Sequence, residues 1–104
     1  MKKIVMKFGG TSVATGKNIR HVAKLIADNR SEGCEVVAVV SALEGVTDQL
    51  IQAAEEAKKG NRKYIRKFKQ EILERHLVTA KETIKNGQIR EEAEQTLKAR
   101  IDEL

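Results

Sequence analysis

The feature that most constrains the fold is an uninterrupted apolar run at residues 36–40, Val-Val-Ala-Val-Val. Such a run predicts a strand buried on both faces, which is typical of parallel sheets. An earlier β-branched run at residues 3–8 ends at two glycines, and a helical apolar pattern fills residues 17–30. Strand, helix and strand in this order predict one βαβ unit of an α/β fold, with a right-handed crossover.

The rest of the chain is helical in pattern. Apolar stripes at helical spacing run over about residues 47–59, 62–85 and 89–104, and Gly60 and Gly87 lie between them. Three mainly amphipathic helices are therefore expected to follow the βαβ unit, and such helices gain most of their stability by packing. The length of 104 residues fits one domain. Within it we expect loops with possible chemistry in residues 1–47 and a helical segment in 48–104.

The positive charge lies in the helical half. Residues 1–57 carry seven basic and seven acidic side chains, whereas residues 58–104 carry thirteen and eight, so the net +5 belongs there. Residues 58–69 alone hold seven basic side chains and no acidic one. This block is either a solvated helix face or a contact for nucleic-acid phosphates. With three aromatic residues and no nucleic-acid-reading motif in the chain, nucleic acid is the weaker alternative.

The cysteine and the histidines predict no metal centre. Cys34 is the single cysteine, which excludes an internal disulfide framework and a four-cysteine zinc site. It also suits a reducing compartment, so we expect a cytoplasmic protein. His21 and His76 are 55 residues apart and lack metal-ligand spacing, so we expect structural roles for both. The chain contains no apolar run of the roughly 18 residues that would span a bilayer, so no membrane partner is expected.

Residues 7–12, Lys-Phe-Gly-Gly-Thr-Ser, place a lysine at a strand end, then two glycines, then two hydroxyls. Glycines let backbone N–H groups approach an anion closely, and lysine supplies a point charge for a phosphoryl group. The pattern predicts a phosphate cradle, with a plain turn between strand and helix as the alternative. The Walker and dinucleotide patterns do not fit, because the glycine spacings are wrong and Asn18 follows Gly16-Lys17.

A second polar segment follows the second strand. Ser41 comes directly after it, and Thr47 lies beyond a loop that contains Gly45. Because ligands bind beyond the carboxyl ends of parallel strands, Lys7, the glycine pair, Ser41 and Thr47 are expected to converge on one pocket. The simpler alternatives are a helix cap at Thr47 and an ordinary strand-end hydroxyl at Ser41.

Together the two segments carry a family resemblance. Residues 7–13 (KFGGTSV) and residues 40–50 (VSALEGVTDQL) resemble the start of an aspartate kinase, a member of the amino acid kinase superfamily. The resemblance covers at least residues 1–50, and the helical remainder is compatible with it. It implies the N-terminal part of a three-layer α/β/α fold. It also implies ATP-dependent phosphorylation of L-aspartate to 4-phospho-L-aspartate, the step toward lysine, threonine and methionine.

The resemblance implies a role for each residue of the first segment. Lys7 would contact the ATP phosphates and stabilise charge in the transition state, as the catalytic residue. Gly9 and Gly10 would offer backbone N–H groups to the phosphoryl group, while Thr11 and Ser12 would line the junction of nucleotide and substrate. Magnesium would bridge phosphate oxygens, so that catalysis would rest on positioning and electrostatics.

In the second segment, the resemblance implies that Ser41 and Thr47 hold aspartate, whose carboxylate is itself the nucleophile. The other parts of such a site find no match in 104 residues, so we expect an incomplete catalyst. Its partners would be the remainder of the kinase chain or another subunit, and a homo-oligomer is expected. Two alternatives stay open: a non-catalytic helical interaction or oligomerisation module that retains the phosphate loop, and another kinase of the superfamily.

Overall fold

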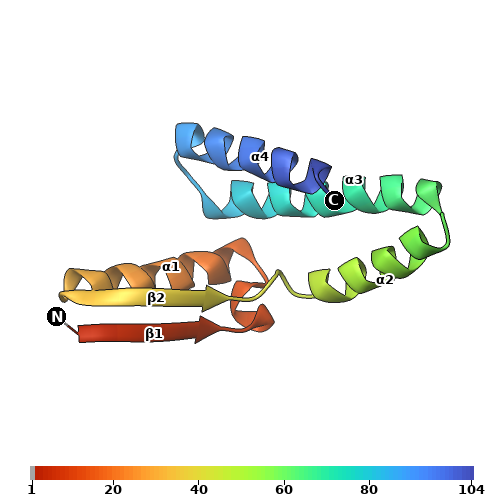
Figure 1. Ribbon diagram of the computed structural model, residues 1–104. Coiled ribbons are helices and arrows are strands. Elements are labelled where there is room, and N and C mark those ends of the chain that lie inside the picture. Colours follow the sequence, from red (N-terminus) through yellow and green to blue (C-terminus); the bar gives the residue numbers. More distant parts are fainter. Residues whose placement is uncertain (1) are drawn as a thin grey trace. The chain divides into compact units, whose positions relative to one another are not determined.

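A computed structural model describes residues 2–104, which form two compact units. One unit extends to Gly45 and the other runs from Val46 to Leu104, and each is described by itself. Figure 1 labels the elements. In chain order they are β1 (Lys2–Phe8), the 3₁₀ helix η1 (Gly10–Val13), α1 (Gly16–Ser31), β2 (Cys34–Val40), α2 (Val46–Lys58), α3 (Arg62–Thr83) and α4 (Gly87–Asp102).

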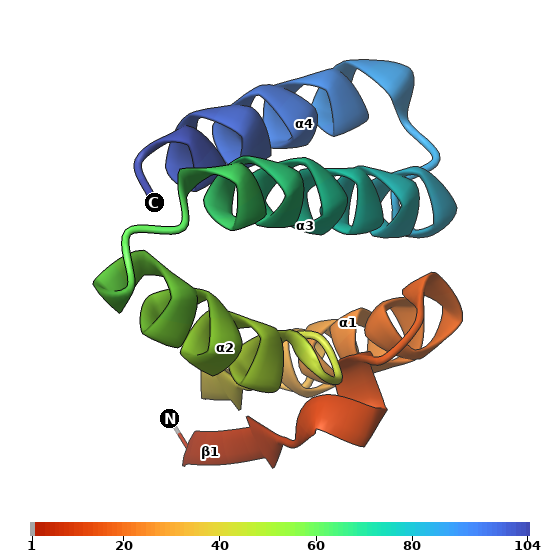
Figure 2. The ribbon, with the colours of Figure 1, turned by 90° about the vertical axis from the view of Figure 1, so that its right-hand side faces the viewer.

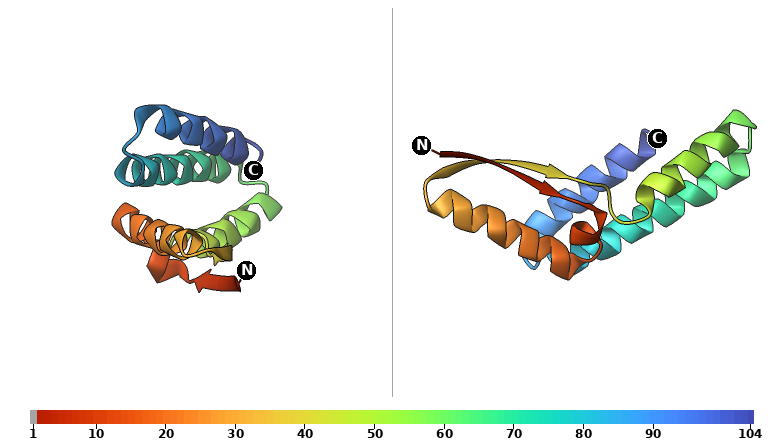
Figure 3. Two further views of the ribbon diagram at one scale, coloured as in Figure 1. Left: turned by 90° about the vertical axis from the view of Figure 1, so that its left-hand side faces the viewer. Right: turned by 90° about the horizontal axis from the view of Figure 1, so that it is seen from below.

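The first unit is the predicted βαβ unit. Strands β1 and β2 pair in parallel, with Lys2 opposite Cys34 at one end and Phe8 opposite Val40 at the other. Helix α1 connects them and runs along the sheet (Figure 3, right). The mixed α/β class and the helices after β2 are confirmed, with boundaries within two residues of those expected from the sequence.

Local chemistry accounts for both ends of α1. At its start, the hydroxyl oxygen of Thr15 accepts a hydrogen bond from the backbone N–H of Asn18 at 3.2 Å, which satisfies one of the unpaired donors of the first turn. After the C-cap Glu32, Gly33 takes a φ of +88° that L side chains rarely adopt. The chain can therefore turn at Gly33 and enter β2 at the buried Cys34.

The sheet corrects one expectation. The prediction that residues 36–40 are buried on both faces is wrong, because Val37 and Val39 are 56% and 49% exposed in the part of the chain that the structure describes. The register sets Val5 opposite Val37, so these valines share one face, and Val5 is 71% exposed. Helix α1 packs on the other face, where Phe8 is buried. Within the described residues of the βαβ unit a single helix packs on the two strands, on one face only.

The second unit is helical. Helices α3 and α4 lie side by side and run in opposite directions (Figures 1 and 2). The carboxamide oxygens of Asn61 and Asn86 cap their first turns, and the Lys69 ammonium donates to the carbonyl of Asp102 at 2.9 Å. The buried side chains come from all three helices: Val46, Ala53, Phe68, Ile72, Ala80 and Ile101. Across residues 2–104, the helices lack the combination of length and apolarity needed to cross a bilayer.

The turn at Gly33 gives a stability prediction. A Cβ added at Gly33 or at Gly9 would meet no atom within 4 Å, but only Gly33 has a positive φ. Gly33→Ala should therefore lower the free energy of unfolding by about 1 kcal/mol through backbone strain. Gly9→Ala, the matched control, should change it by less than about 0.5 kcal/mol. Urea unfolding measures both, and equal losses in the two variants would contradict the prediction.

Candidate functional site

The loops that follow β1 and β2 meet at one edge of the sheet. The backbone N–H of Ser41 donates to the carbonyl of Phe8 at 3.1 Å, which extends the ladder one residue past β2. A Cβ added at Gly10 would lie 3.9 Å from the carbonyl oxygen of Ala42 and from the Cα of Glu44. The Gly-Gly loop and the segment after β2 are thus neighbours, as expected for the carboxyl ends of two paired parallel strands.

The glycine pair has no evident role in the fold itself. Gly9 has an extended backbone, with φ −77° and ψ 178°, and the positive φ values in the described residues belong to other glycines. A Cβ at Gly9 would meet nothing within 4 Å, and at Gly10 it would make ordinary van der Waals contacts. Alanine would therefore be tolerated at both positions within this fold.

Lys7 lies on the face of the sheet opposite α1. It pairs in register with Val39, and the alternation of a strand directs it away from Phe8, which faces α1. The Lys7 side chain is exposed and, within residues 2–104, makes no ion pair. Its ammonium group is available at the carboxyl end of β1, one residue before the strand ends.

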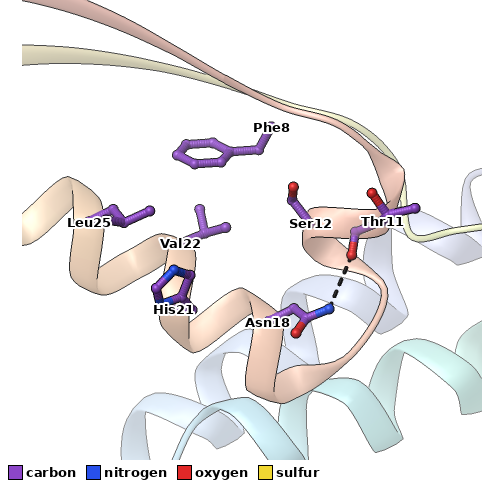
Figure 4. A pocket seen from close by; sticks show the side chains of 7 residues that line it. All are labelled: Phe8, Thr11, Ser12, Asn18, His21, Val22 and Leu25. Carbon is purple, nitrogen blue, oxygen red and sulfur yellow. Dashed lines mark hydrogen bonds between the residues drawn. The ribbon is translucent and has the colours of Figure 1, made fainter.

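The two hydroxyl residues lie in η1 and face a different space. A hollow of about 370 Å³ lies between β1, η1 and α1, and Figure 4 shows the side chains around it. It is lined by Phe8, Thr11, Ser12, Asn18, His21, Val22 and Leu25. Lys7, Gly9, Gly10 and Ser41 do not line it. The structure thus brings Thr11 and Ser12 into one hollow, but Lys7 and Ser41 lie outside it.

Asn18 was not predicted from the sequence as a site residue, but it lines this hollow. Its carboxamide Nδ2 donates to the carbonyl of Thr11 at 3.1 Å (Figure 4, dashed line). Its own backbone N–H donates to the Thr15 hydroxyl, so the first turn of α1 is bonded to the 3₁₀ turn that begins at Gly10. The signal in the sequence was the spacing of Thr15 and Asn18, a capping residue with a polar side chain three positions later.

Thr47 departs from one expectation. Helix α2 begins at Val46, so Thr47 is the second residue of that helix and not its cap. It is exposed and belongs to the helical unit, whereas Ser41 belongs to the βαβ unit. Gly45, with a φ of +83°, supplies the turn that leads into α2. The threonine hydroxyl is thus carried by a helix start that directly follows the loop after β2.

Titratable groups add little to the site. The pKa of Lys24 is raised, because its ammonium donates to Asp28 at 2.8 Å and is attracted by that carboxylate, but this pair lies on the exposed surface of α1. A ring nitrogen of His76 lies 2.7 Å from the carbonyl oxygen of Ile72, one turn earlier in α3. Among residues 2–104, His, Cys, Asp and Glu side chains form no group of three that could hold a metal ion.

Comparison with known proteins identifies the family of this chain. The model of the amino acid kinase family matches residues 2–100, nearly the whole chain. The chain belongs to the amino acid kinase family. An aspartokinase of Pseudomonas aeruginosa is 50% identical over 54 residues, and one of Geobacillus stearothermophilus is 45% identical over 53. An aspartate kinase of Stutzerimonas stutzeri is 46% identical over 56 residues.

These stretches cover about half of this amino acid kinase chain, between 51% and 54%, but only 13% to 14% of each relative. The chain thus spans a small part of the length of the relatives it matches. The resemblance to the N-terminal portion of an aspartate kinase is confirmed. Membership of the amino acid kinase family is shown, and the activity and the substrate are matters for proposal.

The contact of Asn18 with the loop gives a second prediction. Asn18→Ala removes the hydrogen bond to Thr11, so hydrogen exchange at the Ser12 amide, which is bonded to Gly9, should rise about fivefold, as for the loss of about 1 kcal/mol. Asn29→Ala is the matched control, because Asn29 also donates to a backbone carbonyl but only within α1. A similar rise in both variants would show that Asn18 does not hold the loop.

Proposed function

We propose that this chain supplies the phosphate-binding and aspartate-binding loops of an aspartate kinase. The reaction is transfer of the γ-phosphoryl group of ATP to the side-chain carboxylate of L-aspartate, which gives 4-phospho-L-aspartate for lysine, threonine and methionine synthesis. By itself the chain is an incomplete catalyst, and the remaining groups come from the rest of a kinase domain. We place the reaction in the cytoplasm.

The glycine pair is the observation that carries the proposal. Gly9 and Gly10 need no glycine for backbone conformation, and no neighbour within the described residues would clash with a Cβ. A phosphoryl group that approaches the backbone N–H groups closely is a physical reason for glycine at such positions. This loop also follows directly from β1 and adjoins the segment after β2, the edge at which α/β sheets bind ligands.

Lys7 supplies the charge that phosphoryl transfer requires. Its ammonium is exposed and unpaired within residues 2–104, so no internal carboxylate competes with phosphate oxygens for it. As the γ-phosphoryl group moves, this positive charge stabilises the negative charge that develops on the oxygens. Mg²⁺, which would accompany ATP, would screen the negative charge of the phosphates.

The remaining hydroxyls serve orientation. Thr11 and Ser12 border the junction of nucleotide and substrate, and Ser41 donates a hydrogen bond to aspartate at the end of β2. Thr47, in the first turn of α2, is the second hydroxyl proposed to bind aspartate. Relatives named aspartokinase or aspartate kinase support aspartate as the substrate. Positioning of this kind accounts for most of the catalysis, because the substrate carboxylate is the nucleophile and the protein forms no covalent bond.

The face of the sheet opposite α1 supports the proposed partner. Val5, Val37 and Val39 expose apolar surface on the same face, beside Lys7. Water contact with such surface is unfavourable by roughly 25 cal/mol per Å². We propose that the remainder of a kinase chain or another subunit, in a homo-oligomer, covers this face. A helical module that merely associates would not need an accessible glycine pair.

A chimera tests the proposed activity. The stretch of this chain that matches the Geobacillus stearothermophilus aspartokinase over 53 residues replaces the corresponding segment of that enzyme. ADP release is then measured with ATP, Mg²⁺ and aspartate. We expect aspartate-dependent turnover, and Lys7→Ala should lower kcat by about a hundredfold, the loss typical of one charge-stabilising donor. Gly9→Ala should weaken ATP binding without changing the free energy of unfolding.

Lys2→Ala is the matched control, because Lys2 is also an exposed lysine of β1 but lies at the other end of the strand. It should leave kcat unchanged. Equal activity of the Lys7→Ala and parent chimeras would remove the catalytic role of Lys7. ADP release that does not depend on aspartate would remove the substrate assignment while leaving the phosphate loop in place.

A further inference from the structure

The basic block of residues 58–69 takes no part in the proposed kinase site, yet part of it forms a hollow within the helical unit. Arg62, Arg66 and Lys69 follow one another at intervals of four and three residues, which places them on one face of α3. They line a hollow of about 550 Å³ at the corner where α2 leads into α3. Ala57 of α2 and Ile65 of α3 also line it.

In the described part of the chain, the two arginines of this hollow are free of carboxylate partners, whereas Lys69 donates to the carbonyl of Asp102 and Asn61, another lining residue, donates to the carboxylate of Glu56. No carboxylate lines it, and within residues 2–104 neither Arg62 nor Arg66 makes an ion pair. Two other lysines of the block do have acidic neighbours, since Lys59 lies 3.7 Å from Glu56 and Lys67 lies 3.9 Å from Glu71. Two guanidinium groups one helical turn apart, each with a planar fork of donors, suit a phosphate or carboxylate.

An apolar space adjoins the basic one. A second hollow, of about 210 Å³, shares Ala57, Ile65 and Lys69 with the first. Apart from these shared residues, it is lined by apolar side chains: Leu50, Ala53, Ala54, Phe68 and Leu104. A cationic opening that continues into an apolar groove matches a ligand with one anionic end and one apolar end, better than it matches a bare ion.

We propose that this corner of α2 and α3 binds a small amphiphilic anion, independently of the phosphate loop. The phosphate or carboxylate of the ligand pairs with Arg62 and Arg66, and its apolar part rests against Ile65 and Ala57. The volume of the basic hollow lies within the range of about 300–1,000 Å³ that small-molecule sites occupy. The basic block is then neither a uniform solvated face nor a track for nucleic acid, because only one of its faces is a site.

Titration of the 104-residue chain with simple probes tests this site. Phenyl phosphate, benzoate and inorganic phosphate are added at constant ionic strength, and amide chemical shifts are followed by NMR. Phenyl phosphate should shift amides of residues 60–69 and bind at least about threefold more tightly than inorganic phosphate, because its ring buries apolar surface. Comparison of phenyl phosphate with benzoate distinguishes a phosphate ligand from a carboxylate ligand.

A charge-matched pair of variants locates the binding. Arg62→Ala/Arg66→Ala should lower the affinity for phenyl phosphate by about tenfold or more, the loss expected for charge-assisted hydrogen bonds. Lys58→Ala/Lys63→Ala removes the same charge from exposed positions outside the hollow and should change it less than about twofold. Arg62→Lys/Arg66→Lys keeps the charge without the guanidinium fork and should give an intermediate affinity.

Several results would overturn the proposal. Equal losses in the two alanine variants would mean general attraction to a basic surface. Tight, steeply salt-dependent binding of a single-stranded oligonucleotide, with no response to phenyl phosphate, would make the block a nucleic-acid contact instead. Circular dichroism checks that the variants fold, and if the alanine variant does not, the lysine variant and the map of shifted amides decide.

Discussion

The parallel ladder between β1 and β2 is the constraint on which the candidate site depends. Its register sets Phe8 opposite Val40, and the bond from Ser41 to the Phe8 carbonyl continues it into the loop. This pairing brings the Gly-Gly loop against the segment after β2, although more than 30 residues separate them. A slip of one residue would exchange the two faces of a strand, and Phe8 would leave the helix-covered side.

The same ladder divides the chemistry between two faces. Helix α1 covers one face and encloses a hollow with Thr11 and Ser12, while Lys7 lies on the other face among exposed valines. A phosphate held by Lys7 and the glycine backbone would therefore sit at the strand ends and not inside the hollow of Figure 4. Asn18 links the two regions, because it fixes the turn that follows the glycines.

The helical unit is held together by helix packing and not by a strand ladder. Its stability comes from side chains buried between α2, α3 and α4, and its capping asparagines define where the helices start. The net positive charge belongs to residues 58–104 of this unit, and residues 1–57 carry no net charge. The basic side chains of residues 58–69 differ in their surroundings. Within the described residues, Lys59 and Lys67 have carboxylate neighbours, whereas Arg62 and Arg66 do not.

Local patterns in the sequence predicted the helices and strands, their order and the family. Apolar periodicity, the glycines at positions 33 and 60 and the motif at residues 7–13 are local signals, and they located helices and strands to within two residues. The exposure of Val37 and Val39, the place of Thr47 within α2 and the hollow shared by Arg62 and Arg66 became known from the folded chain. Burial and convergence depend on which segments pack together, and a local pattern contains no record of whether a second layer is present to cover a face.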